Sequence, residues 1–108
     1  MEEKIDRLAD LAIELTRGEV RDILDYYIPF KNYFLEHPNE SIIDDFKDVI
    51  EVDIGKSLIY LKIKIKLLNA KYEKWGTESY LKDIKELNEE YQEFYDIYMA
   101  QKAKRNHK

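Results

Sequence analysis

The side chains best suited to chemistry in this sequence are lysines gathered in one stretch. Residues 56–76 carry six lysines and a single acid, Glu73, so this stretch has a net charge of +5 in a chain whose total is −5. Ammonium groups at this density attract anions. A solvated helical surface laced with salt bridges gives the same alternation of charge and is the alternative. The stretch is therefore a candidate anion-binding surface.

Side chains for catalysis or metal binding are scarce. The chain has no Cys and two His. His37 stands beside Pro38 in an expected loop and His107 lies in a charged tail, so neither has a neighbour that would orient it as a base. The ligand spacings of zinc and di-iron sites are missing, as is a glycine-rich phosphate loop. Five acids offer at most a weak site for a hard divalent cation: Glu40, Asp44, Asp45, Asp48 and Glu51. We expect no catalytic residue, metal or cofactor.

Composition favours a single all-α domain over residues 1–108. The chain is 44% hydrophobic and 38% charged, with three Gly and two Pro, which suits a helical core and leaves few turn residues for β-hairpins. No apolar run exceeds four residues, so neither a secretory signal nor a membrane span is expected. The absence of Cys agrees with a reducing compartment, and we expect a cytoplasmic location.

Apolar side chains at spacings of three and four predict helices in the first half, residues 1–53, whose net charge is −9. We expect Gly18 to end the first helix, Pro29 to kink the second and Ser41 to cap the third. The three helices are expected at about residues 3–16, 19–37 and 41–53.

The second half carries the clearest helical pattern. One apolar stripe recurs at alternating spacings of four and three: Ile54, Leu58, Leu61, Ile65, Leu68, Tyr72 and Trp75. After a turn at Gly76-Thr77 the same spacing continues with Tyr80, Ile84, Leu87, Tyr91, Phe94 and Tyr98. The two stripes predict a long antiparallel hairpin over residues 54–104. The whole chain is therefore expected to be a compact bundle of about four to five helices.

Two features of the basic stretch leave alternatives open. Residues 61–67 alternate strictly between apolar side chains and lysine, which is typical of a β-strand, although the longer helical pattern and the lack of an Asn-Gly or Asp-Gly turn favour a helix. In a helix, a second apolar stripe forms opposite the first: Ile59, Ile63, Leu67 and Ala70. A helix that is apolar on two sides lies at the centre of a bundle or contacts another subunit.

A local motif marks the first helix boundary, Leu15-Thr16-Arg17-Gly18-Glu19-Val20-Arg21. Thr16 and Glu19 have the spacing of a capping box for the second helix, but capping does not require Arg21. The pattern Leu-Thr-x-x-x-aliphatic-Arg after a short helix, followed by a helix, a basic helix and a long final helix, resembles the small helical subunit of type III-A CRISPR-Cas effector complexes, the Csm complexes.

In that family the Leu-Thr-x-x-x-aliphatic-Arg element opens the second helix, and Leu15, Thr16, Val20 and Arg21 match it. The basic-x-Lys-Leu core of the family's basic helix is matched by Lys64-Ile65-Lys66-Leu67. The family's acidic-Ala and Ala-Tyr-His elements near the C-terminus are absent here. The aromatic and basic end of the last helix is matched loosely by Tyr95, Tyr98, Met99, Ala100, Lys102 and Lys104.

The resemblance implies a subunit without catalytic activity, several copies of which line a guide RNA and target RNA duplex inside a ribonucleoprotein. The implied partners are guide RNA, target RNA, other CRISPR effector subunits and further copies of this chain. The contacts would neutralise phosphates while pairing with the guide reads the sequence. Because the total charge is acidic, we expect weak binding by the isolated chain. The implied RNA-contacting residues are Arg17, Arg21, Lys62, Lys64, Lys66, Lys71 and Lys74.

The alternative function requires no motif. A small acidic helical module, such as an immunity protein, a phage inhibitor or an adaptor, would bind a basic protein through the acidic surface of residues 44–53. In that case the lysines of residues 56–74 are solvated margins of a core helix.

Overall fold

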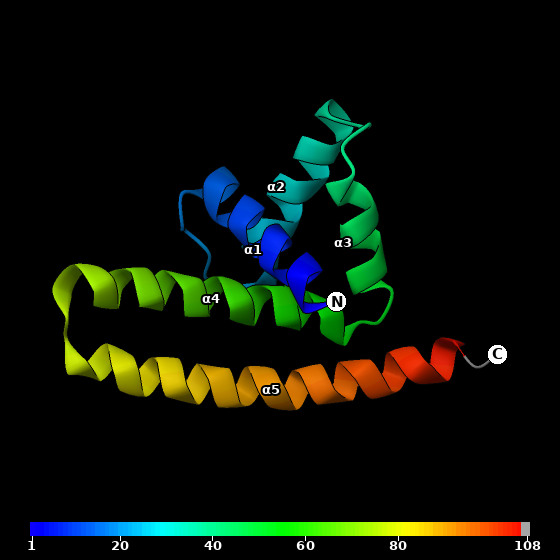
Figure 1. Ribbon diagram of the computed structural model, residues 1–108. Helices are drawn as coiled ribbons and strands as arrows, with labels where there is room; N and C mark the ends of the chain where they lie inside the picture. The colour runs from blue at the N-terminus through cyan, green and yellow to red at the C-terminus, as the bar shows by residue number, and fades with distance from the viewer. Residues whose placement is uncertain (107–108) are drawn as a thin grey trace.

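The computed structural model describes the backbone of residues 1–106 and the side chains of residues 1–105. Five α-helices account for nearly all of it: α1 (Glu2–Thr16), α2 (Ile23–Glu36), α3 (Ile42–Ile50), α4 (Ile54–Trp75) and α5 (Glu78–Asn106). The all-α prediction is confirmed, and residues 61–67 are helical (Figure 1). No helix in the described part combines the length and the apolar character needed to cross a membrane.

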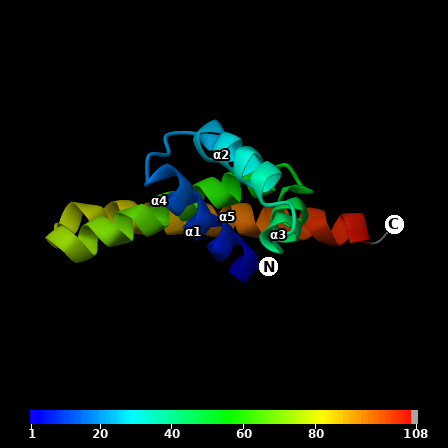
Figure 2. The ribbon, with the colours of Figure 1, turned by 90° about the horizontal axis from the view of Figure 1, so that it is seen from above.

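Helix α4 lies at the centre of the fold. Helix α5 runs antiparallel along one side of it, which confirms the predicted hairpin, and α1, α2 and α3 pack on the other side (Figure 1). Seen from above, α1 crosses α4 obliquely (Figure 2). Because helices cover α4 from two sides, both of its apolar stripes have partners within the chain.

The second stripe of α4 is an internal surface. Ile59 and Ile63 are completely buried and Leu67 is half-buried, while Ala70 is exposed. Of the two expectations for this stripe, the central position in a bundle is correct. The use of Ile59 and Ile63 as a contact between subunits is wrong, because α1, α2 and α3 already cover this side of the helix.

The start of α2 differs from the prediction. Thr16 belongs to the last turn of α1, where its hydroxyl donates to the Ala12 carbonyl at 2.7 Å, so it caps nothing downstream. The capping box of α2 is formed by Asp22 and Asp25: the Asp22 carboxylate accepts from the Asp25 amide at 3.1 Å, and the Asp25 carboxylate accepts from the Asp22 amide at 3.2 Å. The helix therefore begins at Ile23, one turn later than expected.

The other predicted helix ends are partly correct. Gly76 ends α4 in the left-handed conformation, with φ 64°. Ser41 precedes α3, but its side chain makes no capping hydrogen bond. Trp75, the last member of the predicted stripe, is 58% exposed, because the hairpin tip extends past the helices that cover the middle of α4 (Figure 1).

Candidate nucleic-acid interface

The structure divides the basic side chains of α4 between two sides of the helix. Lys62 and Lys66 point toward α1. The Lys62 Nζ lies 3.5 Å from a carboxylate oxygen of Asp6, and the Lys66 Nζ lies 2.9 Å from one of Asp10. Lys62 also lies over the ring of Tyr91, 4.3 Å from its centroid. These two lysines are engaged within the chain and hold α1 against the hairpin.

Lys64 and Lys71 lie on the other side, beside the loop between α1 and α2. They line a groove of about 510 Å³ together with Gly18 and Val20 of this loop. The same loop carries Arg17 and Arg21, both with exposed side chains. Four of the seven predicted residues thus lie either in this loop or on the part of α4 beside it. Among the described residues, none of the four takes part in an ion pair.

Several contacts fix this loop against α4. Val20 is buried, and the Tyr60 hydroxyl donates to the carbonyl of Arg21 at 2.8 Å. The ring of Tyr60 lies under Lys64, whose Nζ is 5.5 Å from the ring centroid. Arg17 adopts the left-handed conformation with φ 56°, and Gly18 follows with φ 81°. A β-carbon on Gly18 would stand 3.1 Å from Leu67, so glycine lets the loop approach α4 closely.

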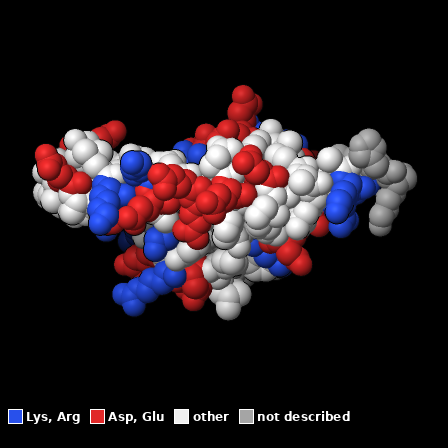
Figure 3. Space-filling view, turned by 90° about the horizontal axis from the view of Figure 1, so that it is seen from below, with Lys and Arg blue, Asp and Glu red and all other residues white. Residues whose placement is uncertain are grey.

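The opposite wall of the groove is acidic. Helix α5 contributes Asp83, Glu86 and Glu90 to the lining, and acidic side chains gather along the middle of the face that α5 presents (Figure 3). A phosphate bound between Lys64 and Lys71 therefore also meets these carboxylates. The remaining predicted residue, Lys74, lies apart at the hairpin tip, with its Nζ 4.9 Å from the Trp75 ring.

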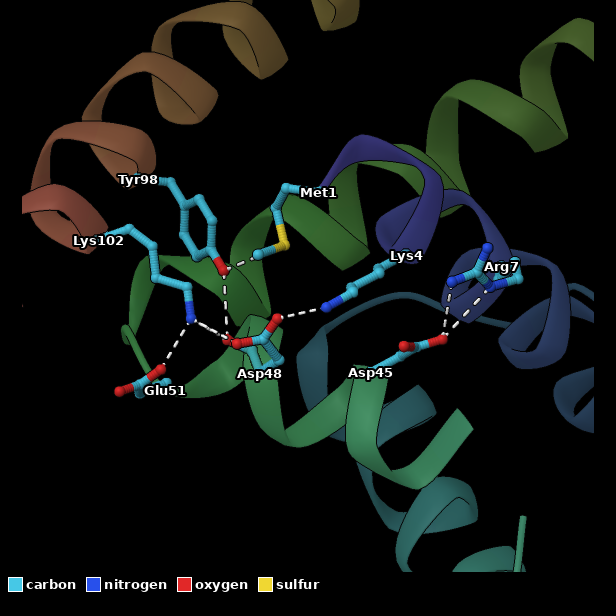
Figure 4. A network of polar contacts seen from close by, with 8 residues as sticks. All are labelled: Met1, Lys4, Arg7, Asp45, Asp48, Glu51, Tyr98 and Lys102. Atoms are coloured by element: carbon cyan, nitrogen blue, oxygen red, sulfur yellow. Dashed lines mark hydrogen bonds and ion pairs between the residues drawn. The ribbon is translucent and has the colours of Figure 1, made fainter. Parts of the chain in front are cut away.

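Most carboxylates of the acidic surface of α3 form ion pairs within the chain (Figure 4). Lys102 is buried, and its ammonium donates to Asp48 and Glu51, at 2.7 Å in each case. Lys4 binds the other Asp48 oxygen at 2.6 Å, and Arg7 binds Asp45 at 3.0 Å. These pairs join α1, α3 and α5, so this surface offers less free negative charge to a basic partner than its composition implies. No group of carboxylates and histidines within the described residues is arranged to hold a metal ion.

The burial of Lys102 was missed by the sequence analysis. Lys102 stands four positions after Tyr98 and so continues the stripe spacing of α5, which is a readable signal for an inward-pointing lysine. Burial lowers the pKa of the Lys102 ammonium, but hydrogen bonds to Asp48 and Glu51 outweigh burial and leave this pKa raised. Hydrogen bonds from Lys102 hold the pKa values of the Asp48 and Glu51 carboxyls below their usual range.

The lowered carboxyl pKa values predict acid sensitivity. The network stabilises the fold above the ordinary carboxyl pKa of about 4, and this contribution disappears as the pH falls through the folded-state values. We expect Asp48→Asn to reduce the free energy of unfolding at neutral pH and to have a smaller effect in acid. Urea unfolding across a pH series measures this difference. Asp44→Asn is the matched control on the same helix, and an equal pH dependence in both variants would contradict the prediction.

His37 has no partner for catalysis in the described structure. Its ring stacks on Tyr33 with centroids 4.2 Å apart, and its Nδ1 lies 3.1 Å from the Tyr33 carbonyl. This is a local packing contact at the end of α2. His107 lies outside the described residues.

Comparisons with known proteins add no relative: no protein-family model, curated protein or solved structure matches this chain.

Proposed function

We propose that this chain is a non-catalytic structural subunit of an RNA-guided antiviral ribonucleoprotein of the type III-A CRISPR-Cas kind. One observation carries the proposal: the Leu-Thr-x-x-x-aliphatic-Arg motif begins in the last turn of α1 and ends in the loop that lies beside Lys64 and Lys71 of the basic helix. Motif and basic helix, far apart in the sequence, are neighbours in the fold. In this proposal the protein works in the cytoplasm, in several copies, and needs no cofactor.

The proposed contact is with the RNA backbone. Arg17, Arg21, Lys64 and Lys71 are the phosphate-neutralising residues, and pairing between guide and target supplies the sequence specificity. Lys62 and Lys66 leave the proposed RNA-contacting set, because they pair with acids of α1. The acidic wall from α5 keeps the affinity of the isolated chain low, so strong binding requires neighbouring subunits.

The salt dependence of RNA binding tests this assignment. We expect Arg21→Ala with Lys64→Ala to weaken binding to a fluorescently labelled RNA duplex and to reduce the slope of log affinity against log salt by about 0.9 for each phosphate that is no longer neutralised. The matched variant, Lys62→Ala with Lys66→Ala, removes the same charge and is expected to leave the slope unchanged. Thermal unfolding of both variants checks that each is folded. Equal slopes in the two variants would remove the loop-side assignment.

Affinity capture of the tagged protein from its native lysate tests the assembly itself. Mass spectrometry of the captured proteins and sequencing of the captured RNA are expected to find repeat-derived guide RNA with larger effector subunits. A single basic protein without RNA would contradict the proposal. The position of the gene among CRISPR genes is an independent check.

A protein-binding module remains the second candidate function, and a specific observation favours it. Helix α2 exposes three large apolar side chains along one face, Leu24, Ile28 and Leu35, with exposed fractions of 60%, 54% and 81%. Exposed apolar stripes of this kind mark sites where proteins associate. The acidic partner surface expected around residues 44–53 is less suitable, because Asp45, Asp48 and Glu51 are ion-paired internally.

A further inference from the structure

An apolar groove lies between the C-terminal half of α2 and α3, away from the basic loop. Its volume is about 400 Å³, and apolar surface dominates its lining. The lining contains no acidic side chain, in a chain with 23 acids. The lining residues are Lys31, Phe34, Leu35, Pro38, Ile43, Phe46, Lys47 and Ile50.

The floor of the groove is built of packed aromatic rings. Phe46 is buried and packs edge-on against the buried Phe30, with ring centroids 5.2 Å apart. Phe34 also packs on the Phe46 ring, with ring centroids 5.3 Å apart. The C-terminal end of α2 and the N-terminal end of α3 stand away from the hairpin (Figure 1). Leu35, at 81% exposure, stands at the rim and gains the most apolar burial if the groove is filled.

The two walls of the groove carry positive charge. Lys31 comes from α2 and Lys47 from α3, and neither forms an ion pair within the described residues. Asp45 and Asp48 of α3 are turned to the other flank, where they bind Arg7, Lys4 and Lys102. The lining of the groove therefore carries two positive charges and no negative one, in the half of the chain whose net charge is −9.

We propose that this groove docks an amphipathic helix of a partner protein, with its apolar face on Phe34, Phe46 and Ile50 and acidic side chains along both edges. An apolar floor receives the anchors that such a helix presents at i, i+3, i+4 and i+7. Lys31 and Lys47 select for carboxylates at the flanks and against a basic helix. The inference is independent of the RNA-contacting residues.

A second copy of this chain is a poorer occupant. Its exposed apolar face on α2 includes Lys31, which would approach the lysines of the groove. The large exposed apolar residues of α5 are Leu81, Ile97 and Met99. Leu81 is far from the other two along the helix, and Ile97 and Met99 are two positions apart, so they do not share one face.

A pair of model peptides tests the groove. Both carry leucines at i, i+3, i+4 and i+7, one with glutamates on the flanks and the other with lysines at the same positions. Titrated into the ¹⁵N-labelled full chain, the acidic peptide is expected to shift the amide signals of Leu35, Ile43 and Ile50. The basic peptide is expected to bind about tenfold more weakly, or not at all.

Charge reversal provides the matched variants. We expect Lys31→Glu with Lys47→Glu to weaken the acidic peptide about tenfold and to strengthen the basic one, an exchange of preference that misfolding cannot produce. The control, Lys82→Glu with Lys85→Glu on α5, is expected to leave both affinities unchanged. RNA binding in the groove variant is expected to be retained, which separates this inference from the proposed function.

Three results would overturn the inference. They are equal affinity for the two peptides, no shift at the groove with either peptide, and self-association that the groove variant abolishes. Sedimentation of the unmodified chain over a concentration series detects the third, which would identify a second copy as the occupant.

Discussion

Replacing Gly55 by alanine is expected to lower the free energy of unfolding by about 3 kcal/mol. Gly55 is buried in the first turn of α4. A β-carbon there would overlap the carbonyl oxygen of Val49 and stand 2.8 Å from its carbonyl carbon. The obstacle is backbone, so no side-chain rotation relieves it, and the end of α3 must move away from α4. Urea unfolding followed by circular dichroism measures the destabilisation.

Gly76→Ala is the matched control for Gly55→Ala. Gly76 has φ 64°, and a β-carbon there has nothing within 4 Å. The substitution therefore carries only the cost of a left-handed conformation, about 1 to 2 kcal/mol. If the two variants are destabilised equally, close approach of backbones at Gly55 is not the reason for its glycine.

Ile63→Ala is expected to lower the free energy of unfolding by about 2 to 4 kcal/mol, because it removes three carbons from a completely buried side chain. The same change is expected to leave the association state untouched. Ile63 belongs to the second stripe of α4, for which a contact between subunits is one of two interpretations of the sequence, and the structure places it under the N-terminal helices. Denaturant unfolding and sedimentation together check both halves of the prediction.

Ile97→Ala provides the comparison for Ile63→Ala. Ile97 is 46% exposed on α5, so its truncation is expected to change stability by about 0.5 kcal/mol or less. Near-native stability of Ile63→Ala with altered association would show that the second stripe is an outer surface after all.

Long periodic patterns are the predictable part of the fold. The alternating spacings of α4 and α5 run over many turns, so one misplaced residue does not disturb the conclusion, and the hairpin follows from them. The pattern fails at Trp75 because periodicity gives the direction of a side chain and not the end of the elements that cover it. The second stripe has the same weakness, because its periodicity shows that these side chains are buried but not whether helices of the same chain or another subunit bury them.

Local signals are weaker wherever two sets of residues satisfy the same rule. Thr16 with Glu19 and Asp22 with Asp25 both have the spacing of a capping box, and only the second is used. Thr16 instead bonds back to Ala12 inside α1. The left-handed conformation of Arg17 has no signature in its side chain, so the length of the loop is not readable from the sequence.

The candidate sites depend on tertiary arrangement. Helical geometry alone separates Lys62 and Lys66 from Lys64 and Lys71, because these pairs point to different sides of one helix. Only the contacts of Asp6 and Asp10 show which of the two pairs of lysines has its charge neutralised by α1. The groove between α2 and α3 has no signal in sequence, since it depends on how these two helices diverge.

The projecting tip of the α4–α5 hairpin has a consequence for motion. Side chains 73–79 are all exposed, whereas Ile59 and Ile63 near the base are completely buried. Opening the tip gives up little apolar burial, so it requires far less free energy than unfolding the whole chain. We expect its amide hydrogens to exchange with solvent through local fraying, and those around Ile59 and Ile63 to exchange only when the bundle itself unfolds. The hairpin is therefore a continuous pair of helices, but its local stability decreases from the base toward the tip.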